Sequence, residues 1–193
     1  APLWAVRGEG DQGNGGSVWG RRFGDPNFSR PLRGCQVIGL DTGLASRGRG
    51  FEIGTAQRQW LTQELASLDP ATPLVILSHA PLARLFYPWR QWTGDAPEIV
   101  PLLSRFHRVV CLHGHTHVPD SGGQRAVAIN FPKDLKPESP NHISLPATSW
   151  ALPLARQGTP THLRPGTGPQ GCGWALVTLG KTFQLFQPYL WPA

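Results

Sequence analysis

Two short, continuous apolar runs limit what this chain can fold into. The first is Pro73–His79, which ends in a histidine, and the second is Val109–Leu112, which leads into a histidine-rich stretch. Apolar runs of strand length without polar alternation are typical of parallel strands buried on both faces. A helix is predicted between them, over about Ala96–Phe106, with Asp95 as its N-cap. A strand, a helix and a second strand in this order predict an α/β fold.

Another strand and another helix are predicted before these runs. The strand covers Cys35–Asp41, and the helix runs from an N-cap at Thr55 to about Leu68. The helix has one apolar face, which is made by Trp60, Leu61, Leu65 and Leu68.

Both ends of the chain are predicted to add short strands. Leu3–Arg7 is expected to be a strand, followed by a glycine-rich loop over residues 8–16. Short β-like runs recur in the second half: Ala126–Ile129, Ile143–Leu145, Trp174–Leu179 and Thr182–Phe186. The last two predict a hairpin, because only Gly180 and Lys181 separate them. We therefore expect a sandwich of sheets with helices outside, in a single domain that spans residues 1–193.

Composition excludes several classes of protein. Only 16% of the 193 residues are charged, and 23 glycines with 20 prolines argue against a long helical bundle. The net charge of +6 suits an anionic substrate, although biased arginine usage explains it equally well. No basic run interleaved with aromatic residues indicates nucleic acid binding, and no run approaches the roughly 20 apolar residues of a membrane span. The sequence predicts a soluble protein, while its compartment and oligomeric state stay open.

The histidines indicate the chemistry. His115 and His117 follow a predicted buried strand and a glycine, so a sharp backbone turn there would aim both imidazoles into one cavity. His79 ends another such strand. Neutral imidazole is the commonest metal ligand in proteins, so His79, His115 and His117 are predicted to form a metal site. An isolated histidine such as His107 is more typical of the protein surface.

This pattern resembles that of the calcineurin-like metallophosphoesterases. Gly114–His117 is similar to the GHxH motif of that family, and His79 within Leu77–Pro81 is similar to the histidine block that precedes it. Weaker similarities are found at Leu40–Thr42, in the helix at Gln57, Trp60, Leu61 and Leu65, and at Leu145–Trp150. In this order the resemblance covers about Leu3 to Phe186.

The resemblance implies a fold and an activity. The fold is an α/β sandwich of two mixed sheets flanked by helices, and the site holds two metal ions such as manganese, iron or zinc. His79 and His115 would bind one metal and His117 the other. Two adjacent metals activate water and offset charge on the attacking and leaving oxygens. The implied reaction is hydrolysis of a phosphate mono- or diester, with a phosphorylated substrate as the partner.

The sequence also departs from the family pattern. An early Asp-x-His block and a Gly-Asp block supply further ligands in the family, and neither is found before His79. We expect them upstream of Ala1, so the chain is predicted to be the C-terminal two thirds of the domain, without its N-terminal strands. The third block, Gly-Asn-His-Asp/Glu, aligns with Gly8–Asp11, where Glu9 replaces the ligand asparagine and Gly10 replaces a histidine that assists the leaving group. Asn14 is an alternative for the asparagine.

Three functions therefore stay open. The first is a metal-dependent phosphoesterase, with Glu9 as a further metal ligand. The second is a degenerate family member that binds a phosphate ligand, a single metal or a partner without efficient catalysis, because glycine at position 10 cannot donate a proton. The third is a single-zinc hydrolase that uses the histidines and a carboxylate.

Overall fold

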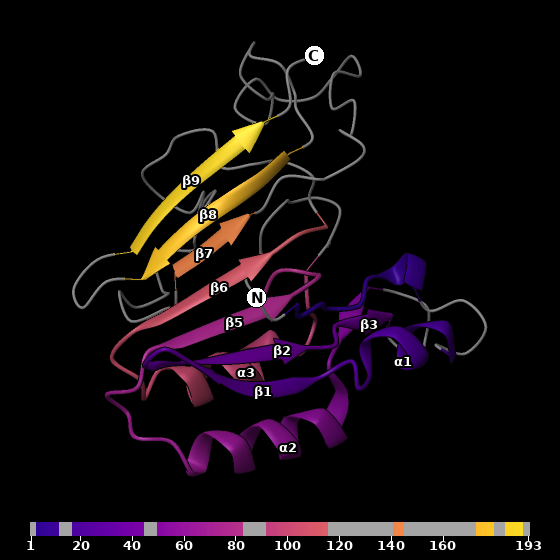
Figure 1. Ribbon diagram of the computed structural model, residues 1–193. Coiled ribbons are helices and arrows are strands. Elements are labelled where there is room, and N and C mark those ends of the chain that lie inside the picture. Colours follow the sequence, from indigo (N-terminus) through magenta and orange to yellow (C-terminus); the bar gives the residue numbers. More distant parts are fainter. Residues whose placement is uncertain are drawn as a thin grey trace, which may run out of the picture.

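The computed structural model of the chain (Figure 1) describes residues 3–11, 17–44, 50–82 and 92–115, together with the backbone of three later strands. Its helices are α1 (Ser17–Phe23), α2 (Gly54–Ala66) and α3 (Ala96–Leu103). Its strands are β1 (Phe28–Leu32), β2 (Cys35–Leu40), β3 (Gly43–Leu44), β4 (Phe51–Glu52), β5 (Leu74–Ser78), β6 (Val109–His113), β7 (Asn141–Ser144), β8 (Gly173–Leu179) and β9 (Gln184–Leu190).

A five-stranded mixed sheet is the centre of the fold, in the order β1-β2-β5-β6-β7. β1 is antiparallel to β2, and the remaining pairs are parallel. The strand predicted at Cys35–Asp41 is thereby confirmed as β2, and the predicted buried parallel strands are confirmed as β5 and β6. Ser78 is paired with Leu40 on one side and with His113 on the other, so the three strands end at one edge of the sheet. Residues that follow these strands are brought together at that edge.

The helices α2 and α3 cover one face of this sheet (Figure 1). Side chains of alternating strand positions, such as Ile38 and Ile76, point to that face and pack with Leu61 and Leu65 of α2. Full burial of such a side chain contributes about 1.5–3 kcal/mol. The predicted apolar face of the helix is confirmed, since Trp60 and Leu68 also pack against this core. The opposite face of the sheet carries a smaller buried cluster, with Val37, Val75, Val110 and Leu112.

The start of α2 differs from the prediction. Thr55 lies inside the helix, and the N-cap is Ile53, which makes no side-chain capping bond. The carboxylate of Asp95 caps the helix instead, because it accepts hydrogen bonds from the backbone N–H groups of Ile53 (3.1 Å) and Gly54 (2.9 Å). Asp95 does occupy the predicted N-cap position of α3, but its side chain makes no capping bond to α3. The prediction that the Asp95 side chain caps α3 was wrong, because its carboxylate caps α2 instead.

Two further boundaries are corrected. Leu3–Arg7 is not a strand: these residues pair with no strand among the described residues, and the segment is held by side chains. The Trp4 ring packs 6.3 Å from that of Phe28, measured between ring centroids. The helix α3 ends at Leu103 rather than near Phe106, where the backbone closes into a turn through a bond from Phe106 N–H to the carbonyl of Leu103.

The later strands agree in part with the prediction. β7 begins at Asn141 and ends at Ser144, and β8 and β9 form the predicted antiparallel hairpin, with β9 extending to Leu190. Ala126–Ile129 lies outside the described residues. An α/β fold with a mixed sheet and helices is therefore confirmed. Apart from the five-stranded sheet, the described residues form only two-stranded ladders, β3–β4 and β8–β9, so the second mixed sheet of the expected sandwich is not seen there.

Candidate metal centre

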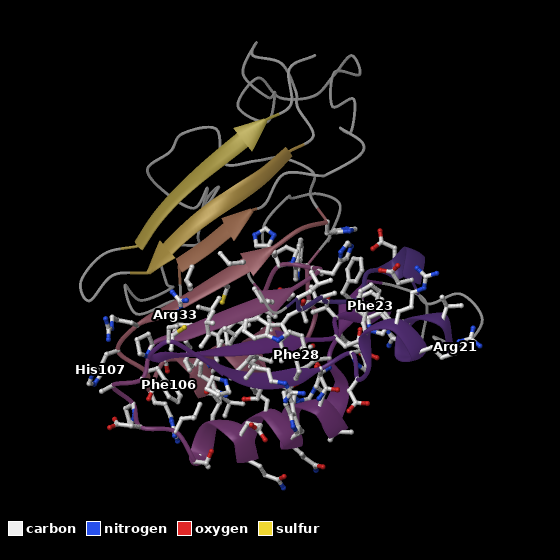
Figure 2. All side chains as sticks on the ribbon, in the orientation of Figure 1. Arg21, Phe23, Phe28, Arg33, Phe106 and His107 are labelled. Atoms are coloured by element: carbon white, nitrogen blue, oxygen red, sulfur yellow. The ribbon has the colours of Figure 1, made fainter. Side chains whose placement is uncertain are left out.

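Two of the predicted ligands meet at the carboxyl edge of the sheet. His79 directly follows β5, and His115 lies two residues beyond the end of β6, which is the parallel neighbour of β5. The Nε2 atom of His79 lies 3.2 Å from the Nδ1 atom of His115. His107, which was expected at the surface, is exposed and lies at the opposite end of the sheet (Figure 2).

Glu9 completes the cluster from a distant part of the chain. It lies in a short turn over residues 9–11, and its carboxylate faces both imidazoles. One oxygen, Oε2, is 2.5 Å from His79 Nε2, and the other, Oε1, is 3.4 Å from His115 Nδ1. The ligand atoms of the three residues all lie within 4.8 Å of one another. The side chain of Glu9 is 44% exposed, whereas that of His115 is only 11% exposed, so the cluster opens to solvent on the side of Glu9.

Main-chain hydrogen bonds hold His79 in place. The carbonyl of His79 accepts a bond from Gly114 N–H at 3.1 Å, which ties the end of β5 to the residue that follows β6. The next residue, Ala80, donates its N–H to the hydroxyl of Thr42 at 2.9 Å, and Thr42 is fully buried. Gly8 lies against the imidazole, since a Cβ atom at that position would be 2.9 Å from the His79 ring.

The backbone at His115 turns sharply, as the sequence predicts. Its φ angle is +60°, in the left-handed region that residues other than glycine rarely adopt. Such a conformation costs about 1–3 kcal/mol and persists only where the surrounding structure holds it. The buried ring of Phe51 lies edge-on to the imidazole, with ring centroids 4.6 Å apart. This packing fixes the direction in which His115 faces the cluster.

Electrostatics favour the ionised form of Glu9. Burial alone raises the pKa of its carboxyl, but a backbone hydrogen bond and the nearby imidazoles of His79 and His115 outweigh that effect. The pKa of Glu9 is therefore lowered from its ordinary value of 4.5. His113, the last residue of β6, is buried, and burial lowers its pKa to about 4. It is neutral at pH 7 and lies within the core rather than in the cluster.

The structure thus brings together three of the four predicted ligands, namely Glu9, His79 and His115. His117 lies outside the described residues, as does Asn14. Gly10 is exposed, and among the described residues, apart from its two neighbours in the chain, none has an atom within 4 Å of the position that its Cβ would take. The cluster therefore has the proposed carboxylate ligand at position 9 and no side chain at position 10.

Sequence reasoning missed an ion pair that begins two residues before Glu9. Arg7 and Asp41 form an ion pair, in which Arg7 Nε also donates to Asp41 Oδ1 at 3.3 Å. The sequence signals at Asp41 were its place at the end of a predicted strand whose neighbours end in histidine and the weak family similarity over Leu40–Thr42.

The chemistry of the donor set fits one metal ion. Two imidazole nitrogens and a carboxylate oxygen are ligands that zinc, manganese and iron accept. A set of three protein ligands leaves further coordination positions of the metal open. An ion bound here would be held by Glu9, His79 and His115.

Comparison with known proteins agrees with this geometry. The family model described as calcineurin-like phosphoesterase matches residues 7–119, which is more than half of the chain and includes the three clustered residues and His117. The chain therefore belongs to the calcineurin-like phosphoesterase family, which is largely made of metal-dependent hydrolases. A search of curated proteins gave no match. Within the described residues, no helix is long and apolar enough to cross a membrane.

Proposed function

We propose that the chain is a metal-dependent hydrolase of phosphate mono- or diesters. The observation that carries the proposal is the convergence of Glu9, His79 and His115, whose ligand atoms lie within 4.8 Å of one another inside the segment that matches the family. The resemblance in sequence further implies a second metal position, to which His117 would belong.

The residues of the cluster have distinct parts in this proposal. His79 and His115 bind through ring nitrogens that carry no proton. The side chain of His115 is mostly buried, which limits the other orientations that its ring could take. Glu9 supplies a negative charge, because its lowered pKa keeps the carboxyl ionised at neutral pH. When bound, the metal supplies Lewis acidity that polarises the phosphoryl group and acidifies water. The open side next to Glu9 is where an anionic substrate would enter, and the net charge of +6 favours its approach.

A second candidate function is binding of a phosphate ligand without efficient turnover. Gly10 favours it, because the resemblance places at this position a histidine that assists the leaving group. A glycine has no side chain that could donate a proton, and apart from its chain neighbours no described residue comes within 4 Å of its Cβ position.

Hydrolysis of aryl phosphates distinguishes the two functions. The unaltered chain, the variant His79→Ala and the control His107→Ala would be freed of metal and then titrated with manganese, zinc or ferrous ion. A phosphomonoester and a phosphodiester of p-nitrophenol serve as probes. We expect metal-dependent release of p-nitrophenol by the unaltered chain and by His107→Ala, and its loss in His79→Ala, because only His79 belongs to the cluster.

The other outcomes are equally informative. Metal binding and phosphate binding without turnover would support the second candidate. A chain that binds neither metal nor phosphate and releases no p-nitrophenol would contradict both functions.

A further inference from the structure

Asp41 is not one of the three clustered residues, yet it is connected to Glu9 through a short series of contacts. Resting on the metal centre proposed above, we infer that Asp41 is a positioning residue: through its ion pair with Arg7 it holds the turn that carries Glu9 against His79.

Asp41 is itself firmly held at the carboxyl end of β2. Its N–H donates to the side-chain oxygen of Gln57 at 2.8 Å, and its carbonyl accepts a bond from the Gln57 amide nitrogen at 2.9 Å. Gln57 belongs to α2, which is packed on the sheet by buried leucines. The carboxylate of Asp41 therefore projects from a rigid support.

The ion pair with Arg7 connects this support to the N-terminal segment. Both oxygens of Asp41 are engaged, one by Nε and one by Nη2 of the guanidinium group. The two side chains are only 21% and 13% exposed, and the residues are 34 apart in sequence. A two-pronged arginine–carboxylate contact fixes orientation as well as distance. Arg7 is thus fixed beside the sheet edge, two residues before Glu9.

The turn that carries Glu9 transmits the position of Arg7. Asp11 closes it from both directions: its carboxylate accepts a bond from Gly8 N–H at 3.0 Å, and its own N–H donates to the Gly8 carbonyl at 3.1 Å. Gly8 lies against the His79 ring without room for a Cβ atom. The side chain of Glu9 is 44% exposed, so its place depends more on this backbone than on packing.

The end of β2 therefore supports both parts of the site. Asp41 holds the turn with Glu9, while its neighbour Thr42 accepts the hydrogen bond from Ala80 that fixes the residue after His79. Groups that orient metal ligands in this indirect way affect metal affinity by about 10–100-fold in known sites.

The test is a double-mutant cycle of metal affinity. Asp41→Asn should weaken binding of zinc or manganese about tenfold in the unaltered chain, measured by competition with a chromophoric chelator. In the Glu9→Ala background the same substitution should leave affinity unchanged, because the connection acts only through Glu9. Arg7→Lys, which keeps the charge but not the fork, should weaken binding less than Asp41→Asn. The control Arg58→Gln removes a similar ion pair, that with Asp95, and should leave affinity unchanged.

A second measurement does not depend on metal. In Asp41→Asn, amide exchange at Gly8 and Asp11, followed by NMR without metal, should be faster than in the unaltered chain, while exchange in α3 stays the same. Unchanged exchange at these two amides would overturn the inference by itself. So would an equal loss of affinity in the Glu9→Ala background. Failure of the unaltered chain to bind metal would instead overturn the proposed function and, with it, the role of Asp41 in metal binding.

Discussion

His79 Nε2 and His115 Nδ1 lie 3.2 Å apart, although 36 positions separate the two residues in sequence. The parallel pairing of β5 and β6 accounts for this, because Ser78 and His113 are register partners and both histidines follow the strand ends. The carboxylate of Glu9 faces both rings.

Two nearby glycines differ in what they tolerate. A Cβ atom at Gly8 would lie 2.9 Å from the His79 ring, whereas a Cβ atom at Gly10 would meet no described residue within 4 Å other than its chain neighbours. We expect Gly8→Ala to push the imidazole and the turn apart and to weaken metal binding about tenfold, on the scale of other disturbed ligand supports. Gly10→Ala should leave the affinity unchanged. Chelator competition on both variants makes the comparison, and equal affinities would show that the close approach of Gly8 to His79 is unimportant.

The cap of α2 comes from Asp95 rather than from Thr55. Asp95→Ala removes two hydrogen bonds to the helix N-terminus and the ion pair with Arg58, so the free energy of unfolding should fall by about 1–2 kcal/mol. Thr55→Ala should change it by no more than about 0.5 kcal/mol, the usual range for an exposed position. Urea denaturation of the two variants measures the difference. A larger effect from Thr55→Ala would restore the cap that the sequence suggested.

Stability should depend on pH through His113. Its pKa is about 4 in the folded chain and 6.5 ordinarily, so the unfolded chain binds the proton more readily. Stability then rises with pH across this window and falls as the pH is lowered from about 6.5 toward 4, by at most about 3 kcal/mol. His113→Gln should flatten this part of the profile. Thermal unfolding with a chelator present, from pH 4 to 7, provides the measurement, and identical slopes for the two proteins would contradict it.

Much of the fold follows from local patterns in the sequence. The apolar runs of β5 and β6 predict buried parallel strands, and parallel strands by themselves place His79 and His115 at one edge. The apolar face of α2 was equally readable. These features depend on periodicity and burial, which a sequence records residue by residue.

Other features depend on contacts between distant residues. The Leu3–Arg7 segment has the composition of a strand, but it is held by Trp4 and by the pair of Arg7 with Asp41 rather than by a sheet partner. Asp95 looks like the cap of its own helix. Its carboxylate instead accepts hydrogen bonds from backbone N–H groups that lie 42 and 41 positions away in the sequence. Such choices are decided by tertiary packing, and no local signal distinguishes them. The approach of Glu9 to the histidines was suggested only by the family resemblance.

The central claim is that Glu9, His79 and His115 hold a metal ion. Elemental analysis of the purified chain, and of His115→Ala and His107→Ala prepared alongside it, tests this directly. We predict at least one equivalent of manganese, iron or zinc in the unaltered chain and in His107→Ala, with a loss of at least one equivalent in His115→Ala. Equal metal content in all three proteins, or none in any of them, would contradict the account.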